Sequence, residues 1–359
     1  MRIILEYQNI IKELDNIKPL EYAKNRNFIN GSVSKLSPYI SRGVISTKQI
    51  LDHLLNKGFQ SKEIEKYIQE LAWRDYWQLV WIEKNIDFDL KQKQLGVNQE
   101  GIAKCIVEAK TGIEAIDQAI IELYQVGYMH NHLRMYLASI ATNIAKSHWA
   151  IPAKWMYYNL LDGDWASNSL SWQWVCGANS NKKYFANQEN INKYTFSKQT
   201  STFLDTSYES IAAMNPPSSF SSMVTEVGES NLPDSDNFVI SDEKEVCIYN
   251  YYNLDPIWRK ELDAHRILLL EPSIFAKYPI GQKAMDFMIS LSQNIPAVRI
   301  FVGEFHELQL GESKVYFKEH PLNYNYKGVE DSRDWLCGIK GYYSSFFGFW
   351  KKAKKELSL

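Results

Sequence analysis

Apolar residues recur at intervals of three and four through the first half of the chain, which is the spacing of amphipathic helices. Residues 64–84 contain no glycine or proline, so one long helix is expected there. Residues 111–127 begin with Thr111, have Glu114 three residues later and end at Gly127, which are start and stop signals of a second helix. Further helices are expected in HNHLRMYLASIATNIAKSHW, in AKWMYYNLL and from Asp164 to about Cys176.

The pattern changes after residue 204. Residues 205–236 are rich in serine, proline and acidic residues, which predicts a linker or an irregular surface segment. Short apolar runs then predict four strands, EVCIYNYYNL, HRILLLEP, VRIFVGEF and KVYFKEH, with a helix in KAMDFMISLSQNI. Strands alternating with helices indicate a parallel sheet with right-handed crossovers. The predicted fold is therefore mainly α: an all-helical domain at 1–204 and a small α/β domain at 237–359.

Composition narrows the class of protein. A chain of 359 residues is long for one core, and 45% hydrophobic with 23% charged residues is typical of a globular protein. No run of 18 uncharged apolar residues occurs, so no membrane span is expected, and the start does not read as a secretory signal. The four cysteines lie far apart without a CxxC pair, which predicts neither a disulfide framework nor a zinc site. A reducing cytoplasm is the expected compartment.

Charge says little about partners, whereas the aromatic content is informative. Residues 1–200 carry 24 Lys and Arg against 20 Asp and Glu, a small excess beside dedicated nucleic-acid binders. Eight of the eleven tryptophans fall between Trp73 and Trp174. Tryptophans in a helical segment usually belong to the core, so those beside charged residues deserve a separate explanation.

Four segments combine charged, hydroxyl and aromatic side chains in a way typical of a ligand site. Small hydroxyl residues at 31–43 open a helix and offer hydrogen-bond donors to a phosphate, although an ordinary helix cap has the same pattern. One face of the 64–84 helix presents a carboxylate, a guanidinium and two indoles, which suits a stacked, charged ligand. The alternative is that the same residues form an ordinary surface Glu–Arg ion pair beside two surface tryptophans. The residues of the four segments are Tyr22, Arg26, Phe28, Glu70, Trp73, Arg74, Trp77, Asn131, Arg134, Met135, Asp162, Asp164, Asn168, Trp172 and Trp174.

Paired carboxylates in LLDGDWASNSLSWQWVCG suggest metal binding or acid–base work. No histidine or further acid stands nearby at ligand spacing, so no metal is expected.

Five motifs occur here in an order and spacing that resemble the FAD-binding domain of the photolyase/cryptochrome family. TGIEAIDQAIIELYQVGYMHNHLRM and DGDWASNSLSWQW are similar to the family patterns TGYPxVDAAMRQL, GWMHNRxRM and DGDxAxNNxxWQW. SKLSPYISRG and ELAWRDYW precede them, so the resemblance covers roughly residues 20–190. Each motif is weak alone, but their shared order is specific.

The resemblance implies a role for each matching residue. Arg134 and Asp162 would form an ion pair beside the isoalloxazine, and Asn168 would face the flavin N5. Trp172 and Trp149 would begin the electron-transfer chain, whose third member stays open among Trp81, Trp155 and a tyrosine. The residues implied to bind FAD are Tyr22, Ser34, Leu36, Ser37, Arg74, Asn131, Arg134, Asp162, Asp164 and Asn168. Those implied to contact a flipped pyrimidine dimer or its DNA are Arg26, Glu70, Trp73, His132, Met135 and Trp174.

Several departures from the family pattern weaken the implied DNA contacts. His132 stands where the family has a phosphate-binding arginine, and Leu170-Ser171 replaces a Gly-Gly pair. KKYFANQENINKYT replaces the common PYFRIFNP. No tryptophan occurs at 91–105, where the outermost member of the chain is expected.

The order of the domains also departs from the family. We expect the family's usual N-terminal antenna domain to be lacking and a shortened, relocated form of it to lie at 237–359, because the C-terminal α/β segment is similar to the first half of an antenna domain. An unrelated small α/β module is the alternative. YYSSFFGFW is expected to form a helix that packs back onto the body.

The leading functional prediction is FAD-dependent, blue-light-driven repair of pyrimidine dimers. Electron transfer from reduced flavin would split the dimer, with damaged DNA as partner and single strands preferred. A cryptochrome-like photoreceptor without repair is the rival, and a light-independent flavin protein is a third possibility. An antenna pigment and the oligomeric state are not predicted.

Overall fold

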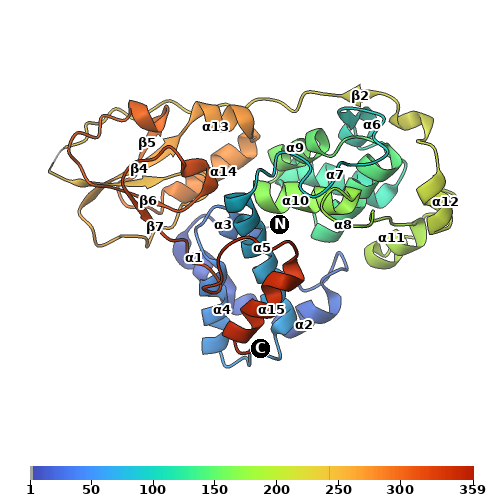
Figure 1. Cartoon of the computed structure of the whole chain (residues 1–359), viewed down its shortest axis with the longest axis horizontal. Coiled ribbons are helices and arrows are strands. Elements are labelled where there is room, and N and C mark those ends of the chain that lie inside the picture. Colours follow the sequence, from blue (N-terminus) through green and yellow to red (C-terminus); the bar gives the residue numbers. More distant parts are fainter. Residues whose placement is uncertain (1–2, 242) are drawn as a thin grey trace. The chain divides into compact units, whose positions relative to one another are not determined.

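The computed structural model describes residues 3–241 and 243–359, and their contacts form two compact units (Figure 1). Unit 1 gathers the segment that ends at Leu20, then Ser34–Ile82 and Glu229–Leu359. Unit 2 consists of Glu21–Val33 and Glu83–Gly228. The units follow contacts rather than linear order, because the first helices group with the C-terminal sheet. The predicted linear boundaries at 204 and 236 remain a prediction.

The helices of unit 1 begin at recognisable signals. Ser46 caps α4 by accepting from the Gln49 backbone N–H, while the Gln49 side chain accepts from the Ser46 N–H, which is a capping box. The long helix predicted at 64–84 is confirmed as α5 (Glu65–Glu83), and the predicted C-terminal helix as α15 (Phe346–Glu356). The other helices in the N-terminal part of unit 1 are α1 (Tyr7–Glu13), α2 (Pro19–Asn25), which passes into unit 2, α3 (Ser37–Ser41) and α4 (Thr47–Asn56).

Unit 1 also contains a parallel five-stranded sheet in the order β5-β4-β3-β6-β7. Its strands are β3 (Glu245–Tyr249), β4 (Ala264–Leu270), β5 (Arg299–Val302), β6 (Val315–Lys318) and β7 (Val329–Asp331). Alternate residues such as Val246, Ile267 and Phe317 form one buried face, which packs against Phe305 and Tyr326. All four predicted strands are confirmed. The fifth, β7, was missed because its three residues are short and polar.

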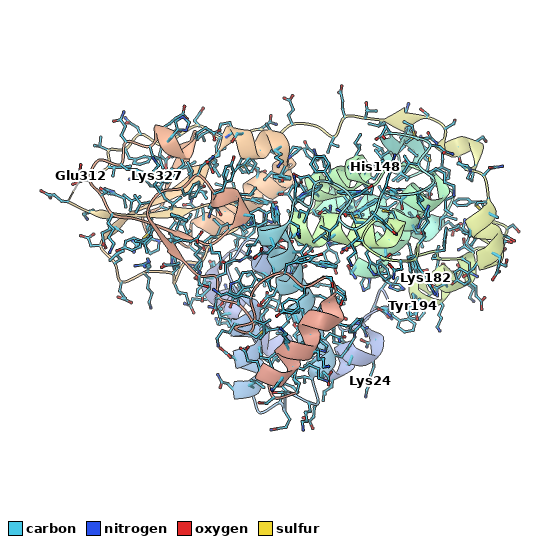
Figure 2. The ribbon with its side chains drawn as sticks, viewed as in Figure 1. Lys24, His148, Lys182, Tyr194, Glu312 and Lys327 are labelled. Carbon is cyan, nitrogen blue, oxygen red and sulfur yellow. The ribbon has the colours of Figure 1, made fainter. Side chains whose placement is uncertain are left out.

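Two helices cover part of this sheet, α13 (Pro272–Lys277) and α14 (Gln282–Ser292) (Figure 1). The predicted helix in KAMDFMISLSQNI is confirmed as α14. Glu312 precedes β6 and Lys327 precedes β7, and both lie at one end of the sheet (Figure 2), as parallel strands require.

Unit 2 is helical apart from one short ribbon. Gly127 ends α7 in the left-handed conformation, with φ 69°, as predicted. The predicted Thr111 cap is wrong: the N-cap is Ile113, and Thr111 donates its N–H and hydroxyl to Asp117 instead. The helices are α6 (Lys104–Val107), α7 (Glu114–Val126), α8 (Asn131–Ser139) with a π turn at Ile140–Ile144, α9 (Ala150–Asn159), α10 (Trp165–Cys176), α11 (Gln188–Thr195) and α12 (Tyr208–Ala213).

The segment predicted as a linker, 205–236, contains few regular elements. It holds α12 and β2 (Met223–Val224), which pairs antiparallel with β1 (Ile102–Ala103). Throughout residues 3–241 and 243–359, no helix has the length and apolar character needed to cross a membrane.

Candidate active site

A buried ion pair joins α8 to the turn before α10. One terminal nitrogen of Arg134, Nη2, lies 2.9 and 3.0 Å from the two carboxylate oxygens of Asp162. The Arg134 Nε–H donates to the Met129 carbonyl at 2.8 Å, which fixes the guanidinium plane. Only 4% of the Asp162 side chain is exposed, so removing the arginine would leave a buried charge uncompensated. The pairing implied by the resemblance is therefore present.

The first turn of α10 holds two more predicted residues. Asp164 is the N-cap, and its carboxylate accepts from the Ser167 backbone N–H at 2.7 Å. The Asn168 amide donates to the Ala153 carbonyl of α9 at 2.7 Å, which sets its orientation. The Ser167 hydroxyl is buried and has no hydrogen-bond partner among the described residues. Such an orphaned hydroxyl is the kind of group that a bound polar ligand satisfies.

The two predicted electron-transfer tryptophans are both buried, Trp149 completely and Trp172 at 2% exposure. The Trp149 indole N–H donates to Asp89 at 2.7 Å, and its ring centroid lies 6.5 Å from that of Trp165. Trp165 in turn donates to Asp87 at 2.8 Å. Sequence reasoning assigned Trp165 no role. Its position directly after Asp164, at the start of α10, was the available signal.

In unit 1, the predicted phosphate-binding residues lie around the start of α3. Leu36 is its N-cap and is almost fully buried, and Ser37 is its first residue. Ser34 hydrogen-bonds the Tyr67 side chain, and burial raises the pKa of Tyr67 to about 12. Arg74 donates from Nη1 to the Ser41 hydroxyl at 2.9 Å. Hydroxyl residues thus precede and open α3, while the Arg74 guanidinium contacts the residue that ends it; both kinds of donor suit phosphate oxygens.

The predicted substrate face of α5 is occupied by the chain itself. The Trp73 ring stacks on Phe346 of α15, with centroids 3.6 Å apart and planes within 9°. Glu70 pairs with Lys66 one turn away, at 3.0 Å. The Lys354 ammonium of α15 lies 2.7 Å from Glu65, at the start of α5. The family resemblance did not predict that a ring of this chain would cover Trp73.

The predicted DNA-contacting residues of unit 2 are more open. Trp174 is 38% exposed, and its ring lies 5.9 Å from that of Tyr184. His132 is wedged between the rings of Tyr136 and Tyr194, both at 4.7 Å. Burial, with a smaller effect of Arg26, lowers the pKa of His132 to about 4, so it is neutral at physiological pH.

The remaining predicted residues lie near these groups in sequence. Met135 is half-buried on α8, Asn131 is the exposed first residue of α8, and Tyr22 is half-buried on α2. The predicted FAD-binding residues thus fall on both units: Ser34, Leu36, Ser37 and Arg74 on unit 1, the others on unit 2. Within the described ranges, no group of three or more His, Cys, Asp or Glu residues is arranged to hold a metal ion.

The ion pair, the capped α10 and the buried tryptophans all lie in one stretch of sequence, which also matches a family model. Residues 67–207 match the FAD binding domain of DNA photolyase. The resemblance predicted from the five motifs is confirmed over this stretch, and with it the prediction of a photolyase-type FAD-binding segment.

Curated relatives and a solved structure are similar to part of this chain. A deoxyribodipyrimidine photo-lyase of Vibrio cholerae is 34% identical over 164 residues, covering 43% of this chain and 35% of the relative. One of Alkalihalophilus pseudofirmus is 32% identical over 162 residues, covering 43% and 33%. The chain therefore spans about a third of the length of these relatives. A solved bacterial class III photolyase of Agrobacterium tumefaciens shares 26% identity over 48% of this chain and 38% of its own, with a TM-score of 0.39.

Proposed function

We propose that this protein binds FAD and repairs pyrimidine dimers in DNA under blue light. The observation that carries the proposal is the buried Arg134–Asp162 pair beside the capped start of α10, within the segment that matches the FAD binding domain of DNA photolyase. When bound, FAD would supply the light-excited electron that opens the dimer and would take it back afterwards.

The side chains around α10 have chemistry that suits the polar edge of an isoalloxazine ring. Arg134 would donate a hydrogen bond while Asp162 holds the guanidinium in place. Asn168, oriented by the Ala153 carbonyl, would present its amide near the flavin N5. The hydroxyl of Ser167 supports this assignment, because it is buried and lacks a partner among the residues described. On unit 1, Ser34, Ser37 and Arg74 have hydroxyl and guanidinium donors of the kind that phosphate oxygens accept.

Trp174 is the side chain best suited to hold a base of the lesion. Its exposed indole would stack on a flipped pyrimidine, a contact worth roughly 1–3 kcal/mol per base. Met135 and Arg26, which belong to the same unit as Trp174, would contact the DNA beside the lesion. Extrusion costs less for a lesion that is already poorly stacked, so stacking also selects for damage. Single strands need no unpairing and would bind better than duplex.

Flavin content tests the cofactor assignment. The purified protein is expected to be yellow and to release FAD, rather than FMN, on denaturation. Arg134→Ala should lose most of the flavin, because it leaves the Asp162 carboxylate buried and uncompensated. Arg259→Ala is a matched control, since Arg259 also pairs with an aspartate, Asp331, at 2.6 Å, but lies in the sheet part of unit 1. A protein that takes up no FAD, or equal flavin loss in both variants, would contradict the assignment.

Repair is tested on dimer-containing single- and double-stranded DNA, with and without blue light. Light-dependent loss of dimers is expected, faster on single strands. Photoreduction of the bound flavin with an external reductant tests the electron path: Trp172→Phe should slow it strongly, and Trp149→Phe should slow it less if a tyrosine replaces the second ring. Equal rates in wild type and Trp172→Phe would show that electrons enter by another route.

A blue-light photoreceptor without repair is the second candidate, and one observation favours it. Phe346 covers the Trp73 ring, which in a repair enzyme would be needed for the lesion. Photoreduction without dimer loss on any DNA would select this candidate.

A further inference from the structure

Two groups of aromatic side chains lie in unit 2, one at Trp174 and one at Tyr194. The Trp174 ring lies 5.9 Å from that of Tyr184, and Tyr194 follows ten residues later in the same segment. The Tyr194 ring lies 5.0 Å from Phe28, and Phe28 stacks on Phe196 at 5.5 Å. We call these five residues the aromatic track. They join the start of the chain to the segment that follows α10.

The far end of the track, Phe196, is held in a costly arrangement. Its side chain is 58% exposed although it is a phenylalanine. Its backbone has φ 57°, in the left-handed region that bulky residues rarely adopt. The Phe28 ring packs against it with the two planes 23° apart, and more than half of Phe196 stays exposed to solvent. An exposed aromatic ring on a strained backbone suggests a function rather than a packing role.

Positive charge accompanies the track. Residues 181–200 carry four lysines against one acidic residue, Glu189. Lys193 lies 5.4 Å from the centre of the Tyr194 ring, and the Tyr194 and Lys182 side chains lie on the same edge of unit 2 in Figure 2. Arg26 adds a cation from the segment 21–33, whose one acidic residue, Glu21, accepts a hydrogen bond from Ser32. Alternating rings and cations suit a chain that has both flat bases and phosphates.

We propose that the aromatic track binds undamaged single-stranded DNA that flanks the lesion, with the exposed Phe196 ring stacking on a base and Lys193 contacting a phosphate. This inference rests on the proposed function and extends it, because it makes the single strand beside the dimer part of the substrate. The segment that supplies most of the track, KKYFANQENINKYTF, is also one where the chain departs from its family pattern. The aromatic track would therefore give this protein a single-strand contact that the family pattern does not provide.

The test measures affinity of the full-length protein for a short undamaged oligothymidine by fluorescence anisotropy. Phe196→Ala should weaken binding roughly fivefold, the loss expected for one stacked base. Phe88→Ala is the matched control, since Phe88 is a 68% exposed phenylalanine elsewhere in unit 2, and it should bind as wild type does. Lys193→Gln should reduce the dependence of log affinity on log salt by about 0.7, and Lys110→Gln should not. Heparin, a polyanion without bases, should bind wild type and Phe196→Ala equally.

Three outcomes would overturn the aromatic track. The first is equal oligothymidine affinity in wild type and Phe196→Ala. The others are a loss of oligothymidine affinity in Phe88→Ala as large as that in Phe196→Ala, and a loss of heparin affinity in Phe196→Ala as large as its loss of oligothymidine affinity. The proposed function fails separately. A protein that binds oligothymidine through Phe196 but carries no flavin and repairs no dimer would retain the track and lose the repair assignment. Normal repair with no contribution of Phe196 to oligothymidine binding would retain the repair assignment and exclude the aromatic track.

Discussion

Trp73 on α5 and Trp174 on α10 match the same kind of position in the family pattern, yet the structure treats them differently. Trp73 lies under Phe346 in a close parallel stack, and Phe346 is itself 2% exposed. Trp174 is 38% exposed, and its ring lies beside that of Tyr184 with the two planes 38° apart. The comparison teaches that a motif specifies a ring and its place on a helix, whereas what covers the ring depends on residues hundreds of positions away.

The surroundings of the two rings reinforce the difference. Around Trp73, the C-terminal segment is fastened to α5 by the Lys354–Glu65 pair and by the Leu336 backbone N–H, which donates to the buried Asp75 at 2.7 Å. Around Trp174, Tyr184 is half-buried and Lys182 is exposed. We infer that Trp73 serves the stability of unit 1, and that it can meet a lesion only if α15 moves away. Four predictions test this comparison.

The largest expected effect is on stability. Trp73→Ala should lower the free energy of unfolding by about 3 kcal/mol, because it removes a large ring and its stacking partner loses contact. Trp174→Ala should cost less than about 1 kcal/mol, since its ring is already partly in water. Urea unfolding of the two variants measures both values. Similar losses would show that the two rings do not differ as described.

The next effect concerns the anchor of the C-terminal segment. Burial raises the pKa of Asp75 to about 6, against the hydrogen bond from Leu336 and the nearby cations, which lower it. The folded protein therefore holds this proton more tightly than the unfolded chain does. The stability that results is fully present below pH 3.8 and is lost as the pH rises through about 6.

Asp75→Asn should remove this pH dependence while keeping an acceptor for the Leu336 N–H. The stability of the variant relative to wild type should rise by on the order of 2 kcal/mol between pH 4 and pH 7. Unfolding curves at several pH values measure the change, with Asp263→Asn as control, because Asp263 is an exposed aspartate near the sheet. A constant difference across this range would mean that the Asp75 carboxyl titrates normally.

The third effect is on recognition. Trp174→Ala should weaken binding of dimer-containing single strands about tenfold, or about 1.4 kcal/mol, with flavin content unchanged. Trp73→Ala should change this affinity much less, because Phe346 already covers the ring. If both variants lose affinity equally, α15 must leave α5 when DNA binds. Phe346→Ala would then be expected to bind tighter than Phe349→Ala, a buried ring of the same helix that contacts Tyr76 instead.

These residues show which features of the structure the sequence alone could predict. The motifs predicted the Arg134–Asp162 pair, the Asp164 cap predicted α10, and periodicity predicted α5 and the central strands, because each depends on local spacing or on a shared pattern. Local signals were less reliable at Thr111. Its hydroxyl donates to the Asp117 carboxylate, and it does not cap the helix. The stack of Phe346 on Trp73 joins residues 273 positions apart. A single sequence contains no periodicity that reports such a contact.

The same reasoning applies to the exposed region. The sequence indicated that KKYFANQENINKYT departs from the family, but not that its rings would line up with Phe28. It also indicated that His132 is a weak phosphate partner. The structure adds the cause, which is burial between two tyrosine rings.

The smallest expected effect concerns this histidine. Because the pKa of His132 is lowered to about 4, the residue stays neutral from pH 8 down to about 5, and DNA affinity should show no contribution from it over that range. His132→Arg would place a permanent cation beside Arg26 and should raise affinity for damaged and undamaged single strands alike, by a few-fold, since a phosphate contact carries no information about the lesion. The slope of log affinity against log salt should steepen by about 0.7. His132→Gln, which is neutral at every pH, should bind as wild type does. A gain in affinity confined to damaged DNA would instead mean that residue 132 contacts the lesion itself and not a phosphate.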